Sequence, residues 1–249
     1  MSIDCFHFFY GIMVSGENMI TSLTNDMVKS LSKLNEKKYR DETGLFLVEG
    51  EHLVLEAKKY GAIETIISTD SEGIIVSPAV MKKISKTESV VKILGVCKKV
   101  NKSELCDRVL MLDNIQDPGN MGTLIRSAIS FGFMTIVLGE GCCDIYSPKV
   151  IRSTQGAIFQ INVLYKNILT FIDELTDYKI YGTSLINGIP LKKIKKEEKM
   201  AIILGNEGQG VKKEILEKNQ NIFIEMNNME SLNVGVAGSI IMYELSKGV

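Results

Sequence analysis

Apolar residues along the chain recur either at helical spacing or in short continuous runs, and these two patterns alternate. Met27, Leu31 and Leu34 lie three and four positions apart, which predicts a helix over 24–37 with Thr24 or Asn25 as its N-cap. In the same part of the chain we expect strands at 44–50, 64–68, 73–77 and 90–96, and helices at 51–60 and 78–85. Strands that alternate with helices are typical of layered α/β domains.

A second series of the same kind follows the polar stretch 98–107. We expect strands at 108–113, 133–138, 158–163, 178–183, 200–205 and 221–225, and helices at 121–131, 148–155, 167–175, 211–218 and 232–246. The sequence therefore predicts an α/β protein with a smaller front domain at 19–100, a linker at 101–106 and a larger domain at 107–249.

Composition excludes several classes of protein. With 45% hydrophobic and 24% charged residues and no apolar run of 18, the 249-residue chain has a soluble composition without a membrane span. A net charge of −1 excludes a partner bound mainly through net positive charge, so nucleic-acid contacts must come from local patches. Two histidines cannot supply a histidine-rich metal site, so we expect no metal. Five cysteines without a CxxC pair indicate reduced thiols and a cytoplasmic location.

The first eighteen residues differ from the rest of the chain. They contain three Phe and one Tyr, no Lys or Arg, and two acidic residues, Asp4 and Glu17. A secretory signal would have a basic start and a small-residue cleavage site, and both are missing. We expect a poorly anchored tail, or a start placed too early with Met19 as the true beginning, and assign no function to it.

Basic residues gather near the start of the front domain, at Lys29, Lys33, Lys37, Lys38 and Arg40. On one continuous helix, positions 29, 33 and 37 would share a face. Two interpretations stay open at this point: a solvated helix face, or a strip that contacts RNA phosphates.

The sequence does not contain the common motifs that bind nucleotide phosphates. Gly139-Glu140-Gly141 follows the apolar run TIVL, but Asp144 stands where a dinucleotide-binding fingerprint needs its third glycine. The sequence also lacks GxxxxGK[ST], which excludes a P-loop. A generic nucleotide-binding α/β protein is therefore disfavoured.

Three other segments, each at the end of an expected strand, are dense in Asn, Ser, Glu and Gly. They are DNIQDPGNMGTLIRSA at 113–128, ILGNEGQGV at 203–211 and IEMNNMESLNVGVAGSIIMYEL at 224–245. Taken singly, each is an ordinary α/β turn. Because ligands collect at the carboxyl ends of parallel strands, three such junctions together predict one composite site.

Residues 107–249 resemble the SpoU (TrmH-type) RNA ribose methyltransferases of the SPOUT class. The resemblance rests on three motifs in order, NIQDPGNMGTLIRSA, LGNEGQG and SLNVGVAGSIIMYE, and on the intervening DIYSPKVIRSTQGAIFQ at 144–160. Residues 19–97, with NEKKYRDETGLFLVEGEHLVLEA, are similar to the small RNA substrate-binding domain of members that act on ribosomal RNA.

The resemblance implies a mostly parallel sheet with a deep trefoil knot, S-adenosylmethionine as cofactor, and a homodimer with its site near the subunit interface. By position, the catalytic residues it implies are Asn120, Arg126, Glu207, Ser231 and Asn233. The cofactor contacts it implies are Thr183, Leu204, Gly205, Ile224, Met226 and Leu232. The implied reaction is methylation of a ribose 2′-hydroxyl in RNA, with ribosomal RNA favoured over transfer RNA. A catalytically inactive RNA-binding module is the alternative.

These residue types suit the implied chemistry. A ribose hydroxyl is a poor nucleophile, so the protein must align the reactants and stabilise the developing negative charge. Arg126 can hold a phosphate beside the hydroxyl, and its permanent charge favours orientation over a role as the base. More ordinary roles stay open: Arg126 as a paired surface residue, Asn120 and Ser231 as helix caps, and Glu207 as a residue that orients loops.

The sequence departs from the family pattern at two places. Glu225 stands where the third motif usually has proline, which puts a carboxylate near a cationic cofactor and leaves the pocket geometry open. Gly235 and Gly238 replace more usual helix formers, at a cost of about 1 kcal/mol each relative to alanine.

Overall fold

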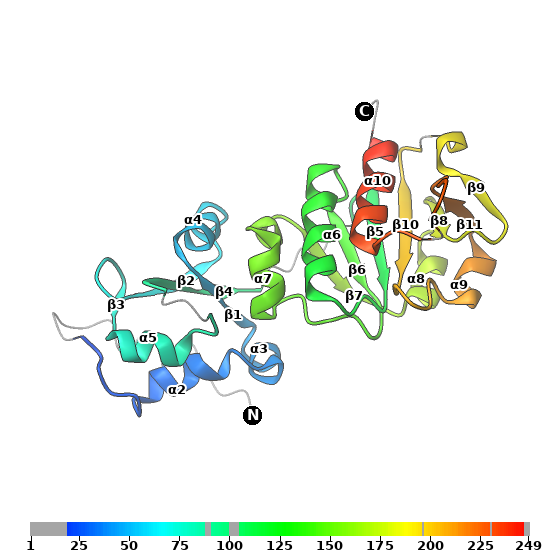
Figure 1. Ribbon diagram of the computed structural model, residues 1–249. Coiled ribbons are helices and arrows are strands. Elements are labelled where there is room, and N and C mark those ends of the chain that lie inside the picture. The colour runs from blue at the N-terminus through cyan, green and yellow to red at the C-terminus, as the bar shows by residue number, and fades with distance from the viewer. Residues whose placement is uncertain (1–18, 88–90, 100–104, 196, 230, 247–249) are drawn as a thin grey trace. The chain divides into compact units, whose positions relative to one another are not determined.

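The computed structural model describes residues 19–87, 91–99, 105–195, 197–229 and 231–246 (Figure 1). The expectations for residues 1–18 lie outside the described residues. The chain divides into two compact units. The first ends at Lys99 and also includes Tyr146–Pro148, and the second takes the rest. The excursion at Tyr146–Pro148 was not expected from the sequence; the Tyr146 ring packs on Phe46, with ring centroids 4.8 Å apart.

The first unit is a four-stranded sheet between helices. Its strands are β1 (Leu45–Glu49), β2 (Ile63–Ser68), β3 (Ile74–Ile75) and β4 (Ile93–Lys98), in the order β1-β4-β2-β3. Its helices are α2 (Asp26–Lys33), α3 (Lys37–Thr43), α4 (Glu51–Lys59) and α5 (Pro78–Ile84). The pairs β1–β4 and β2–β4 are antiparallel, and β2–β3 is parallel.

The core of the first unit follows the predicted periodicity. Met27 and Leu31 of α2 and Met81 of α5 are buried against Leu47 and Leu94 of the sheet. Because side chains alternate along a strand, the other sheet face receives α4, which packs on β4 and β1. Figure 1 shows α4 on one side of this sheet and α2 and α5 on the other.

The predicted helix over 24–37 is wrong in one respect, since α2 and α3 are separate helices. Asn25 caps α2, with its side chain accepting a hydrogen bond from the backbone N–H of Met27. Glu36 is extended between the helices, with φ −103° and ψ 136°. Asn35 holds this break, since its Nδ2 donates to the carbonyls of Ser32 (3.1 Å) and Ile84 (2.7 Å). Lys29 and Lys37 therefore do not share one helix face.

The second unit contains a seven-stranded, wholly parallel sheet of order β7-β6-β5-β10-β8-β11-β9. Its strands are β5 (Arg108–Asp113), β6 (Thr135–Leu138), β7 (Asn162–Tyr165), β8 (Lys179–Thr183), β9 (Gly188–Pro190), β10 (Met200–Gly205) and β11 (Gln220–Phe223). Its helices are α6 (Pro118–Ser130), α7 (Pro148–Thr154), η1 (Ala157–Phe159), α8 (Ile168–Glu174), η2 (Leu191–Lys193), α9 (Lys213–Lys218) and α10 (Val234–Ser246).

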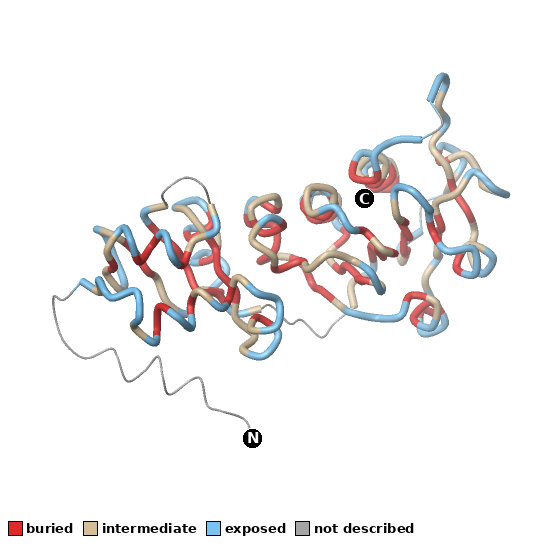
Figure 2. Tube along the Cα trace, turned by 60° about the horizontal axis from the view of Figure 1, so that its bottom comes forward, coloured by how far each residue is buried: buried red, intermediate tan, exposed pale blue. Residues whose placement is uncertain are grey.

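Both faces of this sheet are covered, which explains its continuous apolar strands. All residues of β10 are buried, and Figure 2 shows the buried positions following the central strands. Phe171 of α8 and Ile215 of α9 pack on Met111 and Ile203 in one core cluster. Helices α6 and α10 pack against each other, and a Cβ at Gly238 of α10 would overlap Leu124 of α6. Gly238 therefore allows close packing of the two helices.

Candidate functional site

The parallel sheet brings the carboxyl ends of its strands to one edge. The register aligns Gly205, the last residue of β10, with Asp113, the last residue of β5. Strands β8 and β11 end on the same side, where the chain continues into Ser184 and Ile224. The three motif segments therefore meet at this edge, as the sequence predicted from strand ends alone.

A pocket of about 220 Å³ opens between these strand ends. Most of its wall is apolar, and its polar lining comes from Thr183, Ser184, Asn206, Glu207 and Ser231. The apolar and glycine lining consists of Leu185, Leu204, Gly205, Gly210, Ile222, Phe223, Ile224, Met226, Leu232, Val234, Ala237 and Ile241. An apolar cavity with a few converging polar groups is the usual form of a small-molecule site.

The six residues expected to contact a cofactor all line this pocket: Thr183, Leu204, Gly205, Ile224, Met226 and Leu232. Their role stays a prediction, but the structure brings them together. Other residues of the lining were not predicted from the sequence, among them Ser184, Leu185 and Asn206, and also Ala237 and Ile241 on α10. Asn206 could have been predicted from the sequence, because it stands between the motif residues Gly205 and Glu207.

The glycine-rich loop 205–212 folds back over its own strand. A Cβ at Gly205 would overlap the main chain of Gly210, so only glycine fits there. Asn206 organises the turn: its Oδ1 accepts from the N–H groups of Gly208 (2.8 Å) and Gln209 (3.3 Å). Its carbonyl also accepts from the N–H of Gly210 at 2.8 Å. Glu207 is thereby presented at the pocket wall.

Three residues implied as catalytic form one chain of hydrogen bonds. Asn120 Nδ2 donates to Glu207 Oε1, and Asn233 Nδ2 donates to Asn120 Oδ1 at 2.9 Å. Asn120 was considered as a helix cap, but the cap of α6 is Asp117, whose Oδ1 accepts from the Asn120 N–H at 2.8 Å. Helix α6 thus starts at Pro118, three residues earlier than predicted, and the Asn120 side chain is left to contact Glu207.

The start of α10 corrects a second cap assignment. Asn233 Oδ1 accepts from the N–H groups of Gly235 (3.0 Å) and Val236 (3.2 Å), so Asn233 caps this helix. Ser231, considered for that role, instead lies on the pocket wall.

Arg126 lies apart from this constellation. It is exposed on α6, six residues after Asn120, and is not among the residues that line the pocket. Six residues along a helix correspond to a rotation of roughly 120° and a rise of about 9 Å, so the two side chains leave α6 in different directions. Within the described chain, no acidic partner of Arg126 is found. The alternative that Arg126 is a surface arginine paired with an acid therefore finds no support among the described residues.

Glu225 points away from the pocket residues that flank it, Ile224 and Met226. Its two carboxylate oxygens lie 2.9 and 2.7 Å from Lys192 Nζ of η2, and it is absent from the pocket lining that includes Ile224 and Met226. In an extended segment, neighbouring side chains point to opposite sides. The carboxylate is therefore neutralised outside the pocket.

The basic residues of the first unit are divided between surface and core. Lys29 pairs with Asp26, Lys37 with Asp41 and Lys38 with Glu42, and all three lysines are exposed. Lys33, also exposed, lies over the Tyr39 ring at 5.2 Å. Such exposed pairs contribute little free energy, so the lysines stay available to other anions.

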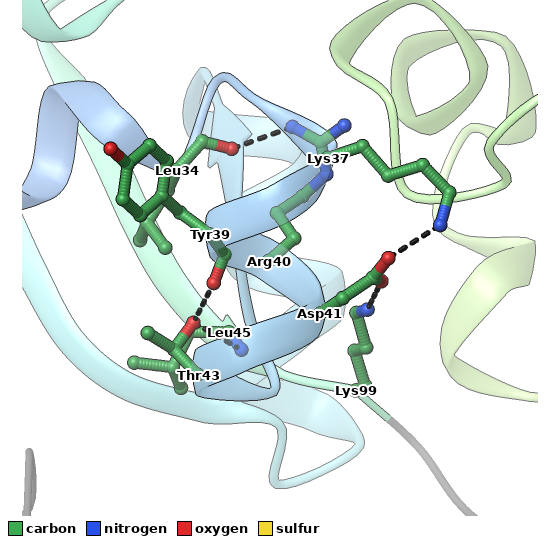
Figure 3. Close-up of polar contacts among 8 residues, drawn as sticks. All are labelled: Leu34, Lys37, Tyr39, Arg40, Asp41, Thr43, Leu45 and Lys99. Carbon is green, nitrogen blue, oxygen red and sulfur yellow. Dashed lines mark hydrogen bonds and ion pairs between the residues drawn. The ribbon is translucent and has the colours of Figure 1, made fainter. Parts of the chain in front are cut away.

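Arg40 is a correction to the expected basic strip. Only 3% of this residue is exposed, and its Nη1 donates to the Leu34 carbonyl at 2.6 Å (Figure 3). The guanidinium thus satisfies a carbonyl at the end of α2, and burial keeps it from contacting a phosphate directly. Figure 3 also shows Asp41 between Lys37 and Lys99, which together hold the pKa of the Asp41 carboxyl below its usual value.

Within the described chain, no cluster of three or more His, Cys, Asp or Glu residues could hold a metal ion. No described helix is long and apolar enough to cross a membrane. The four described cysteines, Cys97, Cys106, Cys142 and Cys143, are free thiols.

Comparison with known proteins identifies family models and relatives that are similar to this chain. Residues 107–243 match the model of the SpoU rRNA Methylase family, and residues 25–95 match the MRM3-like substrate binding domain. The chain is 41% identical over 243 residues to the 23S rRNA (guanosine(2553)-2'-O)-methyltransferase RlmP of Bacillus subtilis, covering 91% of this chain and 98% of that protein.

Solved structures agree with this match. The AdoMet-bound rRNA methyltransferase from Sinorhizobium meliloti is similar, with a TM-score of 0.82, 27% identity, and coverage of 92% of this chain and 97% of that one. A TrmH-family protein from Porphyromonas gingivalis gives a TM-score of 0.80 at 28% identity, covering 90% of this chain and 98% of that one. With its parallel sheet, its three motif segments at one edge and these relatives, the chain belongs to the SpoU rRNA methylase family.

Proposed function

We propose that this chain methylates the 2′-oxygen of a guanosine ribose in 23S ribosomal RNA, with S-adenosylmethionine as methyl donor. One observation carries the proposal: identity of 41% over nearly the whole length of a Bacillus subtilis enzyme whose name states that reaction. The match to a substrate-binding domain at residues 25–95 supports a macromolecular substrate.

The pocket residues fit the cofactor. Leu204, Ile224 and Leu232 offer apolar surfaces for the adenine ring, and the main chain of the 205–210 loop offers polar groups for its edge. Among the described residues that line the pocket, Glu207 is the only one with a charged side chain, and its negative charge suits a cofactor with a sulfonium group. When bound, S-adenosylmethionine supplies an activated methyl group that needs no further activation by the protein.

The role of the protein is then alignment and charge stabilisation. Asn233 and Asn120 hold Glu207 through their hydrogen-bond chain and so fix the pocket wall. Arg126, with its permanent positive charge, binds the phosphate beside the target ribose and stabilises negative charge as the hydroxyl proton leaves to phosphate or water. Ser231 supplies a hydroxyl at the pocket wall that can hydrogen-bond to the bound nucleoside.

The working unit in this proposal is a homodimer. The exposed face of α10 carries Val236, Ile240 and Tyr243, spaced four and three residues apart on one side of the helix. A second copy of the chain would cover this apolar face. Arg126 does not line the pocket of its own chain, so we assign it to the pocket of the partner subunit, which makes each site composite.

We assign RNA binding to the exposed lysines of the first unit, which are Lys29, Lys33, Lys37 and Lys38; the buried Arg40 is not included. We also assign the chain to the cytoplasm, because its substrate is ribosomal and its described cysteines are free. The deep trefoil knot of the second unit, implied by the family resemblance, belongs to the same proposal.

The choice of RNA is tested by methyl transfer in vitro. Purified full-length protein would be incubated with labelled S-adenosylmethionine and equal amounts of 23S rRNA and transfer RNA, both from a strain that lacks this protein. We expect label in 23S rRNA alone. Label in transfer RNA alone would overturn the ribosomal assignment. RNA binding without label in either RNA would favour the inactive module.

A further inference from the structure

Asp113 is a buried carboxylate that the reaction described above does not use. Its side chain is 3% exposed, and it is the only buried acidic residue among those that the structure describes. Removing a carboxylate from water is costly unless hydrogen bonds or opposite charges compensate. Its position at the carboxyl end of β5, level with Gly205, places it directly beside the glycine-rich loop 205–212.

Lys212, at the far end of that loop, compensates the cost of burying the Asp113 carboxylate. Asp113 Oδ2 accepts from the backbone N–H of Lys212 at 3.1 Å, and Oδ1 lies 3.6 Å from Lys212 Nζ. The Lys212 side chain is half exposed, so solvent weakens the second contact. The main anchor is therefore the hydrogen bond from the Lys212 N–H to the buried carboxylate.

The near end of the loop is tied to the neighbouring residue of the same strand end. Asn206 Nδ2 donates to the carbonyl of Asn114 at 3.1 Å. The loop is thus fastened at both ends to residues 113 and 114. Gly205, Asn206, Glu207 and Gly210 of this loop form one side of the pocket.

We propose that Asp113 is a positioning residue for the cofactor: its carboxylate sets the position of the 205–212 loop and thereby the affinity for S-adenosylmethionine. This inference rests on the proposed assignment of the pocket to the cofactor. It requires that breaking the Asp113–Lys212 hydrogen bond from either side weakens cofactor binding, whereas removing only the Lys212 charge does not.

Four variants of the full-length chain separate these contributions. Asp113→Ala removes the acceptor, and Asp113→Asn keeps an oxygen that can accept from the Lys212 N–H. Lys212→Pro removes the N–H donor, and its φ of −54° is compatible with proline. Lys212→Met removes the charge and keeps the N–H. Asp173→Asn, which breaks the exposed Asp173–Lys218 pair away from the pocket, is the matched control.

The readouts are the Kd for S-adenosylmethionine by calorimetry, the RNA affinity by filter binding, and the Tm of the free protein. We expect a rise in cofactor Kd of about tenfold or more for Asp113→Ala and Lys212→Pro. For Asp113→Asn, Lys212→Met and Asp173→Asn we expect a cofactor Kd within about threefold of that of the original protein. The RNA affinity should be unchanged in all of these variants. A lower Tm with an unchanged cofactor Kd in the first two variants would overturn the inference. If Asp113→Ala does not fold, the comparison of the cofactor Kd between Lys212→Pro and Lys212→Met still tests the inference.

Ala237→Phe, which fills the pocket from α10, distinguishes this inference from the assignment of the pocket. Loss of cofactor binding in Ala237→Phe with unchanged binding in Asp113→Ala and Lys212→Pro would remove the role of Asp113 and leave the pocket assignment intact. Unchanged binding in Ala237→Phe would overturn the pocket assignment itself.

Discussion

Asn120 donates a hydrogen bond from Nδ2 to Glu207 Oε1, although 87 residues separate the two in sequence. The direction of this bond is fixed by the next residue in the chain of hydrogen bonds. Asn233 uses its Oδ1 to cap α10, so its Nδ2 must be the donor to Asn120 Oδ1. Asn120 then has only its own Nδ2 left to offer Glu207.

The substitution Asn120→Asp should break this arrangement. The introduced carboxylate would still accept from Asn233, but it has no donor for Glu207 and adds a like charge beside it. We expect Asn120→Asp to lower the free energy of unfolding by about 1–2 kcal/mol and to weaken methyl transfer. Adding Glu207→Gln supplies a donor from the other side and should restore most of the stability, measured by urea unfolding.

Asn167→Asp is the matched control, because Asn167 caps α8 and aspartate caps helices equally well. Its stability should be unchanged. Additive losses in the Asn120→Asp/Glu207→Gln double variant would show that the two side chains are not coupled.

Arg126→Ala should separate chemistry from cofactor binding. Because Arg126 is assigned to the RNA phosphate and does not line the cofactor pocket of its own chain, we expect the Kd for S-adenosylmethionine to stay within about twofold while kcat falls by roughly 10²–10³. Arg126→Lys should recover only part of the activity, since an ammonium lacks the planar donor pattern of a guanidinium. Calorimetry and single-turnover methyl transfer measure the two quantities. A large loss of cofactor affinity in Arg126→Ala would contradict this placement.

Mixing two inactive variants tests whether Arg126 acts across the dimer. Arg126→Ala has an intact pocket, and Ala237→Phe has an intact arginine. In random mixed dimers, one composite site is restored in about half of the molecules, which gives roughly a quarter of the original activity. No recovery after confirmed subunit exchange would place Arg126 in the site of its own chain.

The exposed face of α10 should control assembly. Tyr243 is 51% exposed, and an aspartate there would place a charge in the proposed interface. We expect Tyr243→Asp combined with Ile240→Asp to shift the protein from dimer to monomer in light scattering, with loss of methyl transfer. Leu55→Asp, at a more exposed apolar residue on α4, should leave the mass unchanged. A dimer that survives the α10 changes would exclude this face.

The strand and helix pattern was predictable because it follows local apolar spacing, and β1, β5 and β10 lie within a residue of the expected ranges. The break between α2 and α3 was not predictable in this way. It depends on Asn35 reaching Ile84 and on Arg40 reaching Leu34, and periodicity carries no information on either contact. The short strand β9 was missed because its three residues include a glycine and a proline.

At the candidate site, too, local motifs could be predicted from the sequence, whereas contacts between distant residues could not. Motif residues could be named from the sequence, and the pocket gathers Thr183, Leu204 and Leu232 from three separate segments. The sequence could not show that Asp117 rather than Asn120 caps α6, nor that Arg126 leaves the helix in another direction. It also gave no sign of the tie between Asp113 and Lys212, because that contact spans 99 residues.

The adjacent thiols of Cys142 and Cys143 should be unreactive at neutral pH. Burial disfavours the thiolate and raises the pKa of Cys143 to about 11; it also raises the pKa of Cys142. A raised pKa leaves both thiols protonated at pH 7.5, and the thiolate of Cys143 forms only as the pH approaches 11. We expect iodoacetamide to modify both residues far more slowly than free cysteine at about pH 7.5, as followed by mass spectrometry. Modification at the rate of free cysteine would contradict the raised pKa of the two thiols.

The decisive measurement identifies the atom of the RNA that receives the methyl group. RNA from a strain lacking this protein would be treated with the purified enzyme and S-adenosylmethionine, digested to nucleosides, and analysed by mass spectrometry against untreated RNA. We expect an increase in 2′-O-methylguanosine and protection of one linkage in 23S rRNA from alkaline cleavage. A methyl group on a base, or no product from protein that binds both the cofactor and the RNA, would contradict it.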